Sequence, residues 1–458
     1  MGKRAGAVTV SLDSWHLDIP EFLECQTENG DQRRKAYDIF PQLVVSDLFM
    51  RRVESNADWT LVDPHEVREK LGVELAELWG EAFEETYRDI ESHYDSGLLT
   101  LGKRVNAREL FKQIMRTQVE TGMPYLAFKD TINRANPNKH EGYIPGVNLC
   151  VESFSNVSPG VEMHVCNLVS LNLANLIDSD DLEDACHISV RILDNTIELT
   201  NPPTESAAQH NNKYRTIGVG AMGLADWLAV QGLKYQDTRE ISLLFENIAY
   251  ACTDESARLA RERGAYPAFD GSSWSEGLLL GCRTLEEVTE ASQSPEHIKS
   301  RWAKLRKRII EGGIRNSHIT AIAPNTSSSL VQGCTASILP AYSRFFYDKW
   351  AKGTVPIAPA FIRDSFWYYQ EGKTLDQTHV IDAVATMQQW IDTGISMELT
   401  FNLNAGVYFP EEPDRSLKAK DIFDCMVAAW SKGCKAVYYT RTIQKDSFLG
   451  EACVSCAN

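Results

Sequence analysis

Asn148-Leu149-Cys150-Val151-Glu152 is the most informative stretch of this chain. It places a thiol between an amide and a carboxylate, with the three polar side chains at alternate positions. Alternate side chains of an extended segment share one face, so the three groups are predicted to converge on one small polar substrate. Taken alone, however, such a triplet is more often an ordinary strand or loop that contains a half-buried cysteine.

Four further motifs follow in chain order, and each has a common structural explanation when it stands alone. They are Cys166 within His164-Val165-Cys166-Asn167-Leu168, the loop Pro324-Asn325-Thr326-Ser327-Ser328-Ser329, the pair Tyr438-Tyr439 and the terminal Cys453-Val454-Ser455-Cys456. A run of Ser and Thr often begins a capped helix, and tyrosines at the end of a strand are common packing residues. The two terminal cysteines could be half of a zinc site, but structural zinc needs four ligands, and the ten histidines are scattered.

Together, the five motifs resemble the large subunits of class I ribonucleotide reductases, in the family's order and over essentially all 458 residues. The first resembles the N-L-C-x-E active-site motif of that family. Cys166, which is followed by Ser170-Leu171-Asn172-Leu173, matches one member of the reducing cysteine pair. No motif is decisive alone, but five in this order are highly specific. The terminal pair departs from the family, because its cysteines are spaced more closely than usual.

The resemblance implies a catalytic role for each residue of the first motif. Cys150 would become a thiyl radical and abstract the 3′ hydrogen of the ribose. Glu152 would act as general base on the 3′ hydroxyl, and Asn148 would orient the same region by hydrogen bonding.

The resemblance also implies a route for electrons. Tyr438 and Tyr439 would pass the radical from a small subunit to the active site. Cys166 would supply reducing equivalents and end in a disulfide, which a tail carrying Cys453 and Cys456 would reset by thiol–disulfide exchange.

Two further segments would contact nucleotides. The first is the Ser- and Thr-rich loop, which would hold the substrate diphosphate with Pro324, Asn325, Thr326, Ser327 and Ser328. A helix that begins in this loop would add a favourable dipole for the phosphate groups. Gly2-Lys3-Arg4-Ala5-Gly6-Ala7-Val8-Thr9 resembles the loop that senses the bound effector, with Arg4 on the substrate side.

The implied fold is α/β, namely the C-terminal part of the family's ten-stranded α/β barrel over residues 1–445, with a flexible redox tail over 446–458. An N-terminal ATP cone and the first barrel strands are not recognised ahead of Asn148. We therefore expect a separate polypeptide to supply the N-terminal half, as in a split, phage-type subunit. The alternative is a truncated, inactive remnant that binds nucleotides or partner subunits without catalysis. Retention of all five motifs favours the catalytic interpretation.

The expected activity is ribonucleoside-diphosphate reduction to deoxyribonucleotides for DNA synthesis, carried out as part of a complex. The expected partners are a small radical-bearing subunit, the N-terminal half, thioredoxin or glutaredoxin as dithiol reductant, ribonucleoside diphosphates and nucleotide effectors. This chain is expected to bind no metal or cofactor itself, and the radical metallocofactor is expected in the small subunit.

Composition limits the possible environments of the chain. A net charge of −17 argues against a nucleic-acid backbone as partner. No apolar run reaches the length of about 20 residues that a membrane span needs. Eleven scattered cysteines do not resemble the framework of a secreted protein. A cytoplasmic location is expected, which would be the host cytoplasm if a phage encodes the chain.

Hydrophobic periodicity predicts long helices that alternate with short strands, which is typical of an α/β protein. The predicted helices are 181–199, 238–263, 294–311, 375–393 and 416–432. The predicted strands are 214–219, 318–322, 397–403 and 435–440.

Three other classes of protein leave partial signals. Gly218-Val219-Gly220-Ala221-Met222-Gly223 fits a dinucleotide-binding fingerprint, but it lies far from the chain start and no continuous apolar strand precedes it. In the family that the chain resembles, a similar glycine-rich turn is structural, and we predict the same role for this segment. A glycyl-radical enzyme would need a glycine motif near the C-terminus, and Gly450 lacks the expected arginine- and tyrosine-containing context. A thioredoxin-like protein would carry its cysteine pair early in the chain, not at the end.

Overall fold

The computed structural model describes residues 6–176, 179–350 and 353–444. Its strands are β1 (Val8–Asp13), β2 (Ile39–Val45), β3 (Asp58–Val62), β4 (Gly102–Asn106), β5 (Tyr125–Phe128), β6 (Leu168–Asn172), β7 (Gly218–Met222), β8 (Phe346–Trp350), β9 (Gly353–Ile357), β10 (Leu399–Asn402), β11 (Ala436–Val437) and β12 (Thr440–Ile443). Its α-helices are α1 (Ile19–Glu24), α2 (Asp47–Ser55), α3 (Pro64–Leu71), α4 (Gly80–Asp95), α5 (Ala107–Thr121), α6 (Lys129–Arg134), α7 (Ser179–Leu199), α8 (Glu205–Tyr214), α9 (Leu224–Gln231), α10 (Thr238–Arg263), α11 (Leu285–Ala291), α12 (Glu296–Gly312), α13 (Thr326–Gln332), α14 (Ile362–Ser365), α15 (Gln377–Gln388) and α16 (Ala419–Ser431).

The central strands form two parallel groups that meet in an antiparallel pair. In the first group, β1 pairs with β2 and β2 with β5, all parallel. In the second group, β6 pairs with β7, and parallel bridges continue from Val219 to Thr320 and from Ile322 to Ile395. The chain from Ile395 continues into β10, which pairs with β12. The antiparallel pair of β11 with β5 joins the two groups.

This strand order confirms the α/β class. Two parallel groups joined antiparallel are compatible with part of an α/β barrel. Among the described residues, however, no strand pairing joins β1 to β6, so the predicted barrel is not seen to close.

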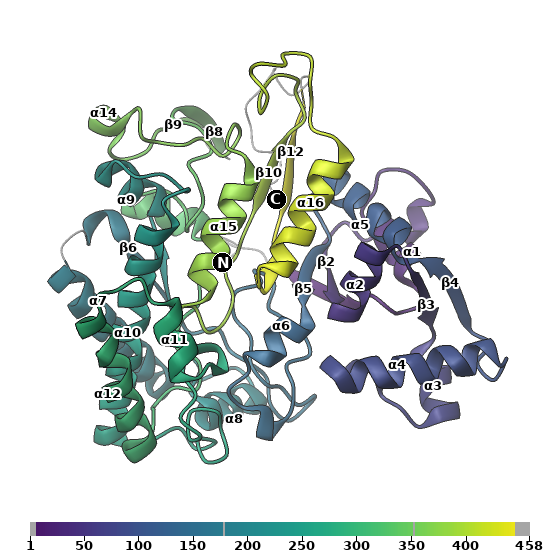
Figure 1. Cartoon of the computed structure of the whole chain (residues 1–458), viewed down its shortest axis with the longest axis horizontal. Helices are drawn as coiled ribbons and strands as arrows, with labels where there is room; N and C mark the ends of the chain where they lie inside the picture. The colour runs from purple at the N-terminus through teal and green to yellow at the C-terminus, as the bar shows by residue number, and fades with distance from the viewer. Residues whose placement is uncertain (1–5, 177–178, 351–352, 445–458) are drawn as a thin grey trace.

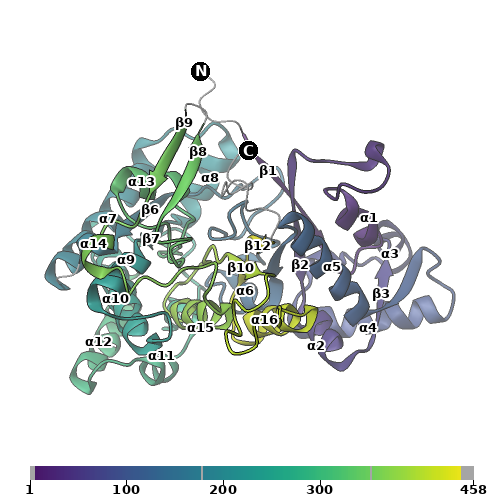
Figure 2. The ribbon, with the colours of Figure 1, turned by 90° about the horizontal axis from the view of Figure 1, so that it is seen from above.

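Helices flank the strands on both sides. In both views α7, α9, α10 and α12 lie on one side and α1 to α5 on the other, with β10, β12, α15 and α16 between them (Figures 1 and 2). Helix α10 packs against α7, α12 and α15. The main hydrophobic core extends through these contacts and includes the fully buried Trp59, Trp302 and Trp390. None of the helices in the described part of the chain has the length and apolar character needed to span a bilayer.

The predicted helices are all found, and 238–263 has the predicted bounds and ends before Gly264. Helix α15 ends earlier than predicted, at Gln388. The strand predicted at 214–219 is wrong at its start, because α8 extends to Tyr214 and Arg215 adopts the left-handed conformation that ends it. The segment predicted at 318–322 forms isolated bridges only.

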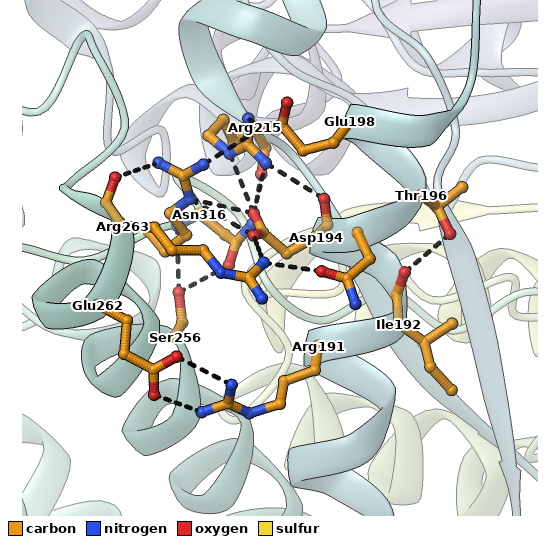
Figure 3. A network of polar contacts seen from close by, with 12 residues as sticks. Arg191, Ile192, Asp194, Thr196, Glu198, Arg215, Ser256, Glu262, Arg263 and Asn316 are labelled. Atoms are coloured by element: carbon orange, nitrogen blue, oxygen red, sulfur yellow. Dashed lines mark hydrogen bonds and ion pairs between the residues drawn. The ribbon is translucent and has the colours of Figure 1, made fainter.

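A buried carboxylate joins several of these elements (Figure 3). Asp194 of α7 has no exposed surface and accepts hydrogen bonds from Arg215 at 2.7 Å and from Arg263 at 2.8 Å. Arg315 lies 3.3 Å from the same carboxylate. Arg215 also contacts Glu198 at 2.7 Å. The carboxylate therefore ties α7 to the ends of α8 and α10 and to the segment that leads towards His318.

Replacing Asp194 with alanine is expected to destabilise the fold by about 3–5 kcal/mol, because it removes the buried counter-charge of Arg215 and Arg315 and leaves them only the largely exposed Glu198. Urea denaturation with linear extrapolation measures the change. Glu262→Ala is the matched control, because it removes an exposed partner of Arg191 shown in the same view (Figure 3) and should change little. An Asp194→Ala variant as stable as this control would contradict the prediction.

Candidate active site

The motif 148–152 forms a turn and not the extended segment predicted from its alternation. The Val151 N–H donates to the Asn148 carbonyl at 3.1 Å, and Val151 has a φ of +63°. A β-branched residue in the left-handed region is strained. The fully buried Val151 side chain holds the turn in place, because it packs in a cluster with Met123, Tyr125 and Tyr438. Tertiary packing, and not strand alternation, therefore positions the motif.

The segment preceding β10 fixes this turn from the other side. The Gly394 N–H donates to the Glu152 carbonyl at 2.8 Å. A Cβ at Gly394 would lie 2.4 Å from the Val151 carbonyl oxygen, so only glycine allows this approach. The Ser396 hydroxyl donates to the Cys150 carbonyl at 2.6 Å and lies 3.3 Å from a Glu152 carboxylate oxygen.

Cys150 faces the predicted tyrosine pair. The Tyr438 hydroxyl donates to the Cys150 sulfur at 3.9 Å. The rings of Tyr438 and Tyr439 have centroids 4.5 Å apart. Tyr125 of β5 contacts both rings, at 4.6 Å from Tyr438 and 5.0 Å from Tyr439. Burial raises the pKa of all three phenols, so each is protonated at neutral pH.

Asn148, Glu152 and Cys166 form the second part of the site. The Asn148 side-chain amide donates to the Cys166 sulfur at 3.7 Å. Glu152 is 2% exposed, and burial raises the pKa of its carboxyl although hydrogen bonds from Asn148 and Ser396 oppose the shift. Cys166 opens to solvent, yet the protein atoms packed around it raise the pKa of its thiol. The structure thus brings together all four residues predicted to be catalytic around one turn, with Cys150 directed at Tyr438.

The predicted phosphate loop lies at the start of α13. Asn325 has a φ of +54° and exchanges hydrogen bonds with the Ser170 hydroxyl of β6, at 2.9 and 3.1 Å. Thr326, Ser327 and Ser328 are exposed at the first turn of the helix. Hydroxyls and backbone N–H groups are therefore presented together at one surface.

The glycine-rich segment packs strands closely. A Cβ at Gly220 would lie 2.2 Å from the Ala321 carbonyl oxygen, and one at Gly218 would lie 2.7 Å from the Ala321 Cβ. Both glycines lie within the buried strand β7. These contacts give the segment the structural role predicted for it.

Three predicted residues, Arg4, Cys453 and Cys456, lie outside the described residues. Ser396, Gly394 and Tyr125 also belong to the site and were not predicted to do so. No motif marks these three residues, and only the fold brings them to the turn.

Two parallel strand groups joined by an antiparallel pair, with a cysteine-bearing turn packed against them, define an α/β protein. The family model described as the barrel domain of ribonucleotide reductase matches residues 1–440, and the chain belongs to this family. It is 70% identical over 459 residues to the ribonucleoside-diphosphate reductase subunit alpha of Synechocystis sp., covering all of this chain and 59% of that protein. It is 31% identical to the corresponding subunit of Helicobacter pylori, covering all of this chain and 64% of that subunit. It is 33% identical to that of Treponema pallidum, covering all of this chain and 54% of that subunit.

Proposed function

We propose that this chain is the catalytic barrel portion of a ribonucleoside-diphosphate reductase that reduces ribonucleotides through a thiyl radical. The observation that carries the proposal is the contact of the Tyr438 hydroxyl with the Cys150 sulfur, on the turn that also carries Glu152. Membership of the reductase family supports it.

The tyrosines would bring the radical to Cys150. Because burial raises the pKa of Tyr438, this phenol must lose its proton together with an electron when it is oxidised. A neutral Tyr438 radical would then take a hydrogen atom from Cys150: the S–H bond breaks, the tyrosine O–H bond forms, and the thiyl radical remains on sulfur. The radical itself would come from the metallocofactor of a small partner subunit, through Tyr439.

The thiyl radical would then start reduction of the ribose. Cys150 would take the 3′ hydrogen, and Glu152 would accept the 3′ hydroxyl proton while the 2′ hydroxyl leaves as water. Two thiols, one of them Cys166, would supply the two electrons and two protons and end as a disulfide. Return of the hydrogen atom from Cys150 to the 3′ carbon regenerates the thiyl radical, and Glu152 returns its proton to the 3′ oxygen. A carboxyl with a raised pKa suits the base, because its basicity is stronger than that of an exposed carboxylate.

The remaining predicted residues would serve binding and turnover. The exposed start of α13 would hold the substrate diphosphate with Pro324, Asn325, Thr326, Ser327 and Ser328. Arg4 would belong to the loop that responds to nucleotide effectors. Cys453 and Cys456 would reduce the active-site disulfide and then be reduced by thioredoxin or glutaredoxin.

The test is reconstitution of turnover. The chain spans 59% of the length of its Synechocystis relative, so the assay supplies the remaining part of an alpha subunit as a second polypeptide. The mixture also contains a radical-bearing small subunit, a dithiol and a ribonucleoside diphosphate, and deoxyribonucleotide formation is measured. We expect turnover in the complete mixture and none when any component is left out. No turnover, in a mixture where an intact relative is active, would contradict the proposal and favour a non-catalytic binding role.

A further inference from the structure

Lys435 is a buried lysine on the part of the chain that leads to the tyrosine pair. It is 3% exposed, and its Nζ donates to the carbonyl oxygens of Asp392 at 2.6 Å, Thr393 at 2.8 Å and Ile391 at 3.4 Å. An ammonium has three N–H donors and no acceptor, so these three consecutive carbonyls match its full hydrogen-bonding capacity. Burial lowers the pKa of Lys435 to about 8, although the Asp392 carboxylate opposes the shift. The ammonium form therefore still predominates at neutral pH.

The carbonyls that Lys435 binds belong to a segment that the Asp392 side chain fixes from its other side. The buried Asp392 carboxylate accepts hydrogen bonds from the backbone N–H groups of Ile319 and Thr320, each at 2.8 Å. It is therefore engaged with the neighbouring segment, and the hydrogen bonds of the ammonium go to carbonyls. Because a buried charge without hydrogen-bonding partners is costly, the ammonium favours the arrangement in which the three carbonyls converge on it.

This segment continues directly into the contacts that shape the catalytic turn. The carbonyl of Thr393 and the N–H of Gly394 belong to one planar peptide group, in which they point in opposite directions. The carbonyl accepts from the ammonium, and the N–H donates to the Glu152 carbonyl at 2.8 Å. Two residues further on, the Ser396 hydroxyl donates to the Cys150 carbonyl at 2.6 Å. A displacement of this peptide away from the ammonium would therefore move its contact with the turn as well.

The backbone of Lys435 fixes the start of the strand that carries the tyrosines. Its carbonyl accepts from the Phe128 N–H at 2.9 Å, and the two residues that follow it form β11, which pairs with β5. The next residue is Tyr438, whose hydroxyl donates to the Cys150 sulfur at 3.9 Å. Lys435 thus links the strand that bears the tyrosine to the segment that supports the turn bearing the cysteine.

We propose that Lys435 is a positioning residue that sets the distance between the Tyr438 hydroxyl and the Cys150 sulfur. Its ammonium holds the Thr393–Gly394 peptide against the catalytic turn, and its backbone holds the start of the tyrosine strand. The consequence for turnover rests on the proposed function, in which a hydrogen atom passes between the hydroxyl oxygen and the sulfur. Small misplacements of reacting groups lower rates strongly. The effect on the turn itself does not depend on turnover and can be measured without it.

The first test is amide hydrogen exchange of the reduced full chain at neutral pH, measured by mass spectrometry of its peptides. Lys435→Met removes the ammonium and keeps a side chain of similar length. We expect exchange in residues 148–153 and 392–397 to become about tenfold faster, the effect of losing one hydrogen bond from a charged group. Exchange in α10 should stay unchanged. A lysine that only stabilised the whole fold would lower protection in α10 together with the turn.

The variant is expected to fold. Replacing a buried charge with an apolar side chain of similar volume is often neutral for stability. The Gln388 side chain also donates to the Ile391 and Thr393 carbonyls, each at 2.9 Å, so a neutral donor remains beside the segment. Lys435→Gln keeps neutral N–H donors on a shorter side chain and is the second variant. It should speed the same exchange by a smaller factor, and it serves as the test if Lys435→Met does not fold.

Lys129→Met is the matched control for the loss of a buried ammonium. Lys129 is 4% exposed, and its Nζ contacts the Ala76 carbonyl at 2.5 Å and the Asp13 carboxylate at 3.4 Å instead of the segment at the turn. This variant should leave exchange in residues 148–153 at the wild-type rate. Wild-type exchange there in both Lys435 variants would overturn the proposal. An increase in Lys129→Met as large as in Lys435→Met would overturn it too.

The second test measures turnover in the reconstituted mixture. Lys435→Met should lower the turnover number by about tenfold or more. The KM for the ribonucleoside diphosphate should stay close to that of the wild type, because the exposed start of α13 is not altered. A wild-type turnover number in Lys435→Met would overturn the role in positioning. If the wild-type mixture is itself inactive, the proposed function fails, and the exchange measurement still decides whether Lys435 holds the turn.

Discussion

Replacing Cys150 with serine is expected to abolish ribonucleotide reduction in the reconstituted mixture. The hydroxyl O–H bond is much stronger than the thiol S–H bond, so a radical on Tyr438 cannot take the hydrogen atom from serine. The fold should remain intact, because serine is close to cysteine in size and Cys150 is only half-buried. Deoxyribonucleotide formation measures the loss, which should reach the background of the assay.

Cys282→Ser is the matched control for Cys150→Ser. Cys282 is also half-buried, but it lies outside the turn and the tyrosine cluster, so this variant should keep wild-type turnover. Measurable turnover in Cys150→Ser, at a level above the mixture without the chain, would remove Cys150 from the proposed mechanism. Equal loss in both variants would point to a general sensitivity to cysteine replacement.

Glu152→Gln is expected to lower turnover by about 10²–10⁴-fold, the usual contribution of a general base. The glutamine amide cannot accept the 3′ hydroxyl proton, although its oxygen can still accept the hydrogen bond from Ser396. Turnover of the variant at saturating substrate gives the measurement. Glu162→Gln is the control, because Glu162 is a partly buried carboxylate that contacts Lys213 and Tyr214 instead of the turn. A Glu152→Gln variant as active as this control would exclude Glu152 as the base.

The pH profile should identify the same group. Burial raises the pKa of Glu152, and the base must be ionised to act. Turnover should therefore fall as the pH drops through this raised pKa, which lies above that of an ordinary glutamate. In Glu152→Gln, the residual turnover should lose this acidic limb. An unchanged acidic limb in the variant would assign it to another group.

Much of this protein could be predicted from patterns that depend on local physics. Helix 238–263 has apolar side chains at helical spacing and a glycine after its last residue, so its bounds are set by the chain itself. The strand predicted at 214–219 is wrong at its start, because α8 ends at Tyr214 and Arg215 adopts the left-handed conformation. The spacing of apolar residues does not reveal such a helix end.

The identity of the chemically important groups was also readable in the sequence, because thiols, carboxylates and tyrosines are few and occur in a recognisable order. Cys150, Glu152, Asn148 and Cys166 lie together as predicted. The predicted mechanism of their convergence, alternation on a strand, was wrong.

The sequence by itself determined the α/β class, the longest helices and the residues able to carry the chemistry. Only the tertiary structure decided how these groups meet. A strained Val151, a Gly394 without a side chain and a Ser396 from a distant segment shape the turn, and Tyr125 completes the tyrosine cluster. These contacts join residues hundreds of positions apart, and their energies come from burial and close packing, which no local pattern encodes.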